Sequence, residues 1–305
     1  MDKWTMDGVP EQLSRVAIVT GANSGIGYQT TIALVKIKFE VVMACRNMEK
    51  AEDAKNKILQ LFPDAKIYPM MLDLSSIADV KAFAGKFRSH FGKLDLLINN
   101  AGIMMPPYKL SQDGFESQLA TNYVGHFALT GLLLSLLTDT TGSRIVNLSS
   151  LAFKWSAINF DDLHFRKGYS KRKAYGQSKR ACLIFAFELQ RRLALAKAQS
   201  ISVAVHPGLS KTNLDQYFPG LIRPLGSLFL QSAQMGALPV LYAALSNDIN
   251  GGEFIGPDGF KQMRGYPTIV HADEYSHNKD VGYRLWEESQ KMTGVYFLEE
   301  GSSTK

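Results

Sequence analysis

Cysteine is scarce in this sequence. Only Cys45 and Cys182 occur among 305 residues, and no Cys-x-x-Cys pair is present. Neither a disulfide framework nor a cysteine-based zinc site is therefore predicted. The six histidines show no His-Glu-x-x-His or other ligand spacing, so we predict no metal site. Two unpaired thiols suit a reducing compartment, and we expect a cytoplasmic protein.

Long hydrophobic runs are also lacking. No run of about 18 apolar residues occurs, and the apolar stretch 129–137 is short enough to be a buried helix. The first ten residues, MDKWTMDGVP, lack the apolar core of a signal peptide. We therefore expect no transmembrane anchor. The net charge is +6, but no basic stripe with interleaved aromatic residues exists, so nucleic acid is not a predicted partner.

What is present is the composition of a globular protein with a sizeable core, with 46% hydrophobic and 20% charged residues. Short apolar strands alternate with helices along the chain. The predicted strands are 16–20, 41–45, 66–72, 94–99, 143–149, 201–206 and 251–255; the predicted helices are 25–37, 49–61, 76–91, 113–137, 173–198 and 234–246. This alternation predicts an α/β fold of the Rossmann type, in which a doubly wound parallel sheet of about seven strands carries helices on both faces. We expect one domain over residues 1–305.

Two stretches interrupt the alternation. Residues 152–172 form an inserted loop after the fifth predicted strand, and residues 208–233 follow the sixth. Both follow the carboxyl ends of strands, where ligands bind in open α/β sheets. The apolar residues of 208–233 indicate a substrate lid, and a core-packed helix pair is the alternative. The lid residues concerned are Phe218, Leu221, Ile222, Leu225, Leu228, Phe229 and Leu230.

A glycine turn, TGANSGIG at 20–27, joins the first strand to the first helix. Its amides and the helix N-terminus suit a diphosphate, and the small residues allow it to approach. The spacing differs from both G-x-G-x-x-G and the P-loop. A turn with a purely structural role could have the same sequence, so this motif indicates a nucleotide site only together with other motifs.

The end of the second strand reads Ala44-Cys45-Arg46-Asn47, without the acid that binds the ribose hydroxyls of NAD. Arg46 offers a rigid fork of donors that matches a phosphate, which favours NADP(H). A solvated Arg46 is the alternative. Asp73, at the end of the third strand, is a candidate for binding adenine or for capping the helix that begins near Ser76.

Tyr175 and Lys179 are four residues apart on a predicted helix and therefore lie on one face. A neighbouring ammonium stabilises a phenolate, so we expect Lys179 to lower the pKa of Tyr175 from its usual value near 10. A tyrosine with such a pKa is suited to acid–base catalysis near neutral pH.

These residues, in this order, resemble the short-chain dehydrogenase/reductases. TGANSGIG (20–27), Asp73, NNAG (99–102), Asn122, the serine pair 149–150, YGQSK (175–179) and HPG (206–208) match the family over about residues 14–256. ACRN (44–47), NNAGIMMPP (99–107) and GPDGF…GYP (256–267) are similar to the retinol-dehydrogenase-like branch. The segment VVMACRNMEKAE (41–52) is also similar to light-dependent protochlorophyllide reductase.

The resemblance implies a role for each matched residue. Tyr175 would be the acid in carbonyl reduction and the base in alcohol oxidation, Lys179 would assist it and bind the nicotinamide ribose, and Ser150 rather than Ser149 would bind the substrate oxygen. Asn122 would hold a water in a proton relay behind Lys179. The cofactor-binding residues would be Gly21, Asn23, Ser24, Gly25, Ile26, Gly27, Arg46, Asn47, Asp73, Leu74, Asn100, Ala101, Gly102, Tyr175, Lys179, Pro207, Gly208 and Thr212.

The predicted function is thus NADP(H)-dependent hydride transfer to or from a carbonyl or alcohol of an apolar substrate, as in a carbonyl reductase. The alternatives are a light-dependent reductase of a tetrapyrrole ring and a nucleotide-sensing protein without catalysis, since fold alone does not prove activity. Ser150 and Tyr175 are 25 positions apart, more than in compact family members, and a retinoid is one candidate substrate. The resemblance leaves a homo-oligomer open.

Overall fold

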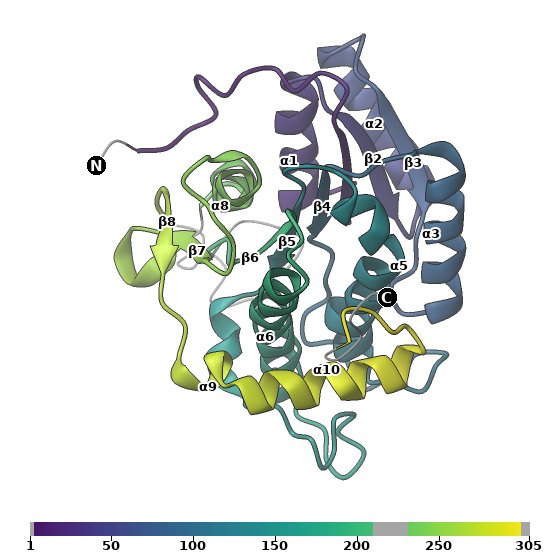
Figure 1. Cartoon of the computed structure of the whole chain (residues 1–305), viewed down its shortest axis with the longest axis vertical. Coiled ribbons are helices and arrows are strands. Elements are labelled where there is room, and N and C mark those ends of the chain that lie inside the picture. Colours follow the sequence, from purple (N-terminus) through teal and green to yellow (C-terminus); the bar gives the residue numbers. More distant parts are fainter. Residues whose placement is uncertain (1–2, 210–230, 300–305) are drawn as a thin grey trace, which may run out of the picture.

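The computed structural model describes residues 3–209 and 231–299. Its centre is one sheet with the strand order β3-β2-β1-β4-β5-β6-β7-β8 (Figure 1). The strands are β1 (Val16–Thr20), β2 (Glu40–Cys45), β3 (Ile67–Met71), β4 (Leu96–Asn99), β5 (Arg144–Leu148), β6 (Ile201–Val205), β7 (Phe254–Pro257) and β8 (Pro267–Val270). The first seven run parallel, so their carboxyl ends share one edge. This confirms the predicted doubly wound Rossmann sheet.

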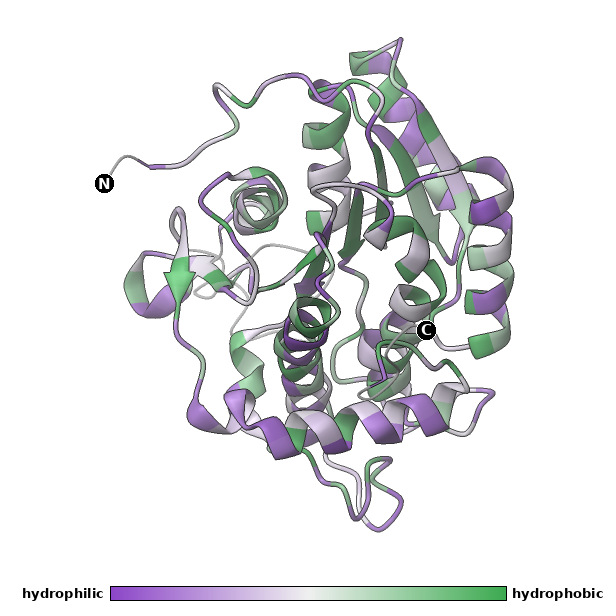
Figure 2. Ribbon diagram, in the orientation of Figure 1, coloured by the Kyte–Doolittle hydropathy of each residue, from purple (hydrophilic) through white to green (hydrophobic). Residues whose placement is uncertain are grey.

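Helices cover both faces of the sheet. They are α1 (Gly25–Lys36), α2 (Met48–Leu61), α3 (Ile77–His90), α4 (Ser117–Leu119), α5 (Gly125–Thr138), α6 (Lys171–Leu195), α8 (Ala233–Leu245), α9 (Glu274–His277) and α10 (Lys279–Thr293). Side chains alternate along each strand, so β1 supplies Val16 and Ile18 to one core, and Ala17 and Val19 to the other. The apolar strands between more polar outer helix faces are visible in Figure 2.

The sheet has one strand more than predicted. The seventh strand begins at Phe254, three residues after its predicted start, and β8 pairs with it in the antiparallel direction. β8 contains only four residues, with Pro267 at its first position, and Ile269 is half exposed. Four residues at the edge of the described sheet, one of them a proline and one half exposed, give only a weak sequence signal for a strand.

The helix predicted over 113–137 begins instead at Ser117 and is irregular. A π-helical turn, η1 (Ala120–Val124), separates α4 from α5 and contains Asn122. A π-turn adds a residue to the helical repeat and is frequent at functional sites. The segment from Ser117 to Thr138 is long and apolar enough to cross a membrane by length and composition, but 72% of that window is buried within the protein. A segment that is buried to this extent within the protein is typical of a core helix.

The inserted loop predicted over 152–172 starts with a 3-10 helix, η2 (Leu151–Trp155), and leads into α6. Gly176 of α6 faces η2, and a Cβ at this glycine would lie 2.9 Å from the carbonyl oxygen of Ala152 and from Cβ of Trp155. The absence of a side chain at Gly176 therefore lets η2 pack closely against the helix that carries Tyr175.

Candidate active site

The glycine turn at the end of β1 forms an open cradle. Gly21 and Gly25 have positive φ angles of 66° and 55°, which suit glycine. A Cβ at Gly27 would lie 2.5 Å from both the Asn100 side chain and the carbonyl oxygen of Gly21. Ser24 is the N-cap of α1, but its side chain makes no capping hydrogen bond. The close backbone packing and the uncapped N-terminus of α1 fit a cofactor diphosphate.

A second loop, at the end of β4, is tied to the first by Thr20. The Thr20 Oγ1 atom accepts hydrogen bonds of 2.9 Å from the amides of Asn100 and Ala101, and the Asn100 side chain donates to the Thr20 carbonyl at 2.6 Å. Gly102 follows, and a Cβ there would lie 3.2 Å from Asn122 Oδ1 and 3.4 Å from Lys179 Nζ. The predicted cofactor loop and two predicted catalytic residues therefore lie side by side.

The residues predicted to select the cofactor lie after β2 and β3. Arg46 is exposed directly after β2. Asn47 is the N-cap of α2, with its side chain accepting from the amide of Lys50 at 2.8 Å. Asp73 accepts from the amide and the hydroxyl of Ser75, while Ser76 caps α3. The alternative that Asp73 itself caps this helix is therefore wrong. Leu74 is buried, and its carbonyl is packed against Gly125 at the start of α5.

The side chain of Asn122 hydrogen-bonds to two separate segments of the chain. Its Oδ1 accepts from the amide of Ile103 at 2.8 Å, and its Nδ2 donates to the Ile103 carbonyl at 3.0 Å and to Ser178 Oγ at 2.9 Å. The side chain thus joins the segment after Gly102 to the helix that carries Tyr175. The main-chain carbonyl of Asn122 has separate partners within the described residues.

His126, which the sequence analysis did not assign to the site, binds that carbonyl. Its Nδ1 lies 2.9 Å from the Asn122 oxygen, and its Nε2 lies 2.9 Å from Thr20 Oγ1. A carbonyl only accepts, so Nδ1 carries the hydrogen and Nε2 accepts from the Thr20 hydroxyl. Burial lowers the pKa of His126 to about 4, which keeps the ring neutral. His126 therefore links Asn122 to the residue that holds the cofactor loop.

The two serines after β5 have different partners. Ser149 Oγ donates to the Lys179 carbonyl at 2.7 Å, and it is fully engaged in holding α6. Ser150 caps η2 through the amide of Ala152 at 3.2 Å, and its hydroxyl lowers the pKa of Tyr175. Ser150 is therefore the serine of this pair that interacts with Tyr175.

Tyr175 and Lys179 both lie on the buried face of α6. Burial raises the pKa of Tyr175 to about 12; the bond from Ser150 opposes this shift and the nearby Cys182 adds to it. The expectation that Lys179 lowers this pKa is wrong for this structure, because burial dominates. Lys179 Nζ donates to the Leu148 carbonyl at 3.0 Å, and burial lowers its own pKa. Tyr175 is thus a protonated phenol at neutral pH.

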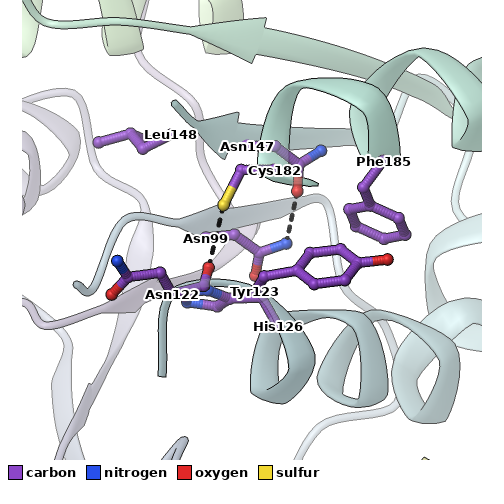
Figure 3. Close-up of a pocket in the computed structure, with 8 residues that line it drawn as sticks. All are labelled: Asn99, Asn122, Tyr123, His126, Asn147, Leu148, Cys182 and Phe185. Carbon is purple, nitrogen blue, oxygen red and sulfur yellow. Dashed lines mark hydrogen bonds between the residues drawn. The ribbon is translucent and has the colours of Figure 1, made fainter. Parts of the chain in front are cut away.

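A cavity of about 10 Å³ lies between residues of β4, β5, η1, α5 and α6 (Figure 3). It is lined by Asn99, Asn122, Tyr123, His126, Asn147, Leu148, Cys182 and Phe185. Cys182 Sγ donates to the Asn122 carbonyl at 3.1 Å, and the buried Oδ1 of Asn99 has no hydrogen-bond partner within the described residues. The volume is close to the minimum for one water molecule, and the lining supplies polar partners.

The end of β6 forms the remaining edge of the site. Gly208 has a positive φ of 68°, and a Cβ there would lie 2.4 Å from the Met263 carbonyl. The Pro207 carbonyl accepts from the side chain of Gln231 at 2.7 Å. Thr212 and most of the predicted lid, including the apolar residues named for it, lie outside the described residues.

Comparisons with known proteins agree with this geometry. The short chain dehydrogenase family model matches residues 15–219. Retinol dehydrogenase 13 of Homo sapiens is 37% identical over 294 residues, covering 92% of this chain and 85% of the relative. Short-chain dehydrogenase TIC 32 B, chloroplastic, of Brassica napus is 40% identical over 246 residues, covering 77% of each.

A solved structure of an uncharacterised protein from Mycobacterium paratuberculosis has a TM-score of 0.82 and 37% identity, covering 97% of this chain and 99% of that one. The family model spans most of the sheet, and the relatives extend over most of the chain. The chain therefore belongs to the short-chain dehydrogenase/reductase family of oxidoreductases and is similar to its retinol dehydrogenases.

Proposed function

We propose that this protein is an NADP(H)-dependent oxidoreductase that transfers hydride between a nicotinamide and a carbonyl or alcohol of an apolar substrate. The observation that carries the proposal is Tyr175, a buried phenol that interacts with Ser150 and lies on the same helix as the buried Lys179. These groups lie at the edge of the sheet where the glycine cradle opens. When bound, the cofactor supplies or accepts the hydride.

The residues present fit such a cofactor. The amides at the start of α1 and the missing side chains of Gly21 and Gly27 accommodate a diphosphate. Asn100, Ala101 and Gly102 would line the adenosine side. Arg46 would bind a 2′-phosphate, which is the feature that distinguishes NADP(H) from NAD(H).

In the reducing direction, Tyr175 would donate its proton to the substrate oxygen while hydride adds to the carbonyl carbon. The C=O bond is reduced to an alcohol, and the phenolate left on Tyr175 must regain a proton. Ser150 would hydrogen-bond the same oxygen as negative charge develops on it, which is a preorganised electrostatic contribution. The elevated pKa of Tyr175 suits this direction because it keeps the proton available.

The path of the returning proton is suggested by the groups behind Tyr175. The resemblance implies that Asn122 holds a water in a relay behind Lys179, and Asn122 lines the cavity that approaches the size of one water. In this proposal Lys179 passes the proton on, and His126 keeps the Asn122 carbonyl in place.

Two further parts of the proposal concern substrate and location. The similarity to a protein named retinol dehydrogenase supports a substrate with an apolar body. Both cysteines are buried and unpaired, which supports a reducing compartment such as the cytoplasm.

Replacement of Tyr175 tests the proposal. In Tyr175→Phe, reduction of apolar aldehydes with NADPH should be abolished, while NADPH affinity stays within about twofold, because only the transferable proton is removed. Tyr68→Phe is the control, since Tyr68 lies on β3 away from this site. Near-native rates in Tyr175→Phe would contradict the mechanism. A native protein that binds NADPH but turns over no carbonyl or alcohol would favour the nucleotide-sensing alternative.

A further inference from the structure

Trp155 lies beside the proposed catalytic tyrosine. It is the last residue of η2, five positions after Ser150, and its ring centroid is 6.1 Å from that of Tyr175 at an interplanar angle of 54°. Its side chain reaches the surface, with 37% of the residue exposed. Close packing at Gly176 fixes the backbone on which this ring stands. An indole next to the proposed reacting groups is therefore partly open to solvent.

Arg172 also packs against this indole. Its guanidinium carbon is 4.8 Å from the Trp155 ring centroid. Arg172 precedes Tyr175 by three residues on α6, so both lie on one face of the helix, one turn apart. Tyr175, Trp155 and Arg172 thus form a row that leads from the acid group outwards to a positive charge.

The guanidinium has the ring as a neighbour but no counter-charge. Within the described residues, Arg172 forms no ion pair, and it is exposed. A guanidinium that is oriented by an aromatic face still has its five N–H donors available in a fixed plane. This arrangement suits a planar anion such as a carboxylate.

The surrounding segment has the same sign of charge. Residues 151–173 contain six basic and two acidic residues, so most of the chain's excess positive charge lies in this one segment. Of the two acids, Asp162 accepts from the amides of Arg166 and Lys167 and is occupied within its own loop. Lys154, Lys171 and Lys173 are exposed and form no ion pair within the described part of the chain. A positive field at this position attracts anions.

We propose that Trp155 and Arg172 form a substrate subsite for a carbonyl compound that has an apolar body and a carboxylate at its far end. The indole contacts the apolar part next to the reacting carbonyl, and the guanidinium binds the carboxylate. This inference rests on the proposed oxidoreductase function and names the class of its substrate. The hydride and proton transfers are those given above, and the carboxylate takes no part in them.

The test compares two substrates of equal length, decanal and the same chain with a terminal carboxylate. Arg172→Gln should raise the KM for the carboxylate substrate about tenfold, the effect of losing one charge-assisted contact, and change kcat little. The KM for decanal should stay within about twofold. Lys173→Gln is the matched control, because it removes the neighbouring exposed charge. It should leave the ratio of the KM values for the two substrates unchanged. Trp155→Ala should raise the KM for both substrates.

A binding measurement separates this subsite from the proposed activity. Decanoate and decanol are titrated against intrinsic fluorescence, with Trp155→Phe identifying the signal of Trp155. Arg172→Gln should weaken decanoate alone, whether or not the protein turns over either aldehyde. If the native protein turns over neither aldehyde but still binds decanoate more tightly than decanol, the proposed function is contradicted and the subsite is not.

Three results would overturn the subsite. The first is an equal preference for decanoate and decanol in the native protein, and the second is an unchanged preference in Arg172→Gln. In the third, Arg172→Gln no longer binds vesicles that contain phosphatidylserine, but its preference between the two substrates is unchanged. That result would show that Arg172 contacts a membrane surface and not the substrate.

Discussion

At the scale of the single residue, the proposed chemistry depends on how far Tyr175 is removed from water. Burial raises its pKa to about 12, and the hydrogen bond from Ser150 offsets only part of this. A phenol with such a pKa loses its proton only under strongly alkaline conditions. It is therefore a proton donor over the whole neutral range, which is the state that carbonyl reduction requires.

This pKa predicts the pH dependence of the reduction. The protonated form is the active one, so the rate should be constant from about pH 7 to pH 10 and fall only above that range. The measurement is kcat for decanal at saturating NADPH across these pH values. A fall in rate between about pH 7 and 9 would show instead that the bound cofactor or Lys179 lowers the pKa of Tyr175 in the complex.

The proposed contact between Arg46 and the 2′-phosphate predicts how the protein chooses between NADPH and NADH. Arg46→Ala should weaken NADPH binding by about tenfold to a hundredfold, the range for one charge-assisted contact to a phosphate, and change NADH binding little. Dissociation constants for both cofactors, measured by fluorescence titration, test this. Lys57→Ala removes another exposed charge further along α2 and is the control. Equal losses for the two cofactors would show that Arg46 does not contact the 2′-phosphate.

At the scale of the element, α10 has a role that the sequence analysis did not identify. Figure 1 shows it crossing the outer side of the helix layer that contains α5 and α6. Its Trp286 is 1% exposed and packs edge-on against Phe127 of α5 at 5.1 Å between ring centroids. Phe297, after the helix, occupies the space above Gly131, where a Cβ would lie 2.5 Å away. The outer surface of α5 is thus covered by the chain itself.

The packing of α10 predicts that a truncation on its buried face costs much more stability than a truncation on its exposed face. Trp286→Ala should lower the free energy of unfolding by about 3–5 kcal/mol, the usual cost of deleting a buried aromatic side chain. Tyr283→Ala, on the same helix but 47% exposed, should cost less than about 1 kcal/mol. Urea denaturation of both variants provides the comparison. Similar losses would mean that α10 does not depend on its contact with α5.

At the scale of the whole molecule, two buried histidines make the fold sensitive to acid. Burial lowers the pKa of His126, between Asn122 and Thr20, to about 4. The same cause lowers the pKa of His206, at the end of β6, to about 4. In the unfolded chain both return to about 6.5. Protons therefore bind more tightly to the unfolded state, and the stability present above pH 6.5 is lost as the pH falls towards 4.

The expected loss is large enough to measure. At about pH 5 each histidine should contribute a loss of about 2 kcal/mol relative to neutral pH. The free energy of unfolding is measured in urea at both pH values. His126→Gln, which does not titrate, should reduce the difference between the two by about half. A stability that does not change between these pH values would contradict the buried, neutral state of the histidines.

The sequence alone determined the parts of this protein that depend on local patterns. Apolar strands alternating with helices specify the parallel sheet, because each strand must be covered on both faces. A spacing of four residues places Tyr175 and Lys179 on one helix face, and a glycine turn after a strand marks the cradle at Gly21 to Gly27. These features need only neighbours within a few residues, so they were predicted correctly.

Only the tertiary structure decided the properties that depend on distant partners. The pKa of Tyr175 follows from burial beneath other elements, and the task of His126 follows from Thr20, which lies 106 positions away. Ser149 and Ser150 are adjacent and identical in type, but only the first is held by Lys179. Burial and long-range hydrogen bonds arise when elements pack together, and no local pattern records which ones will meet.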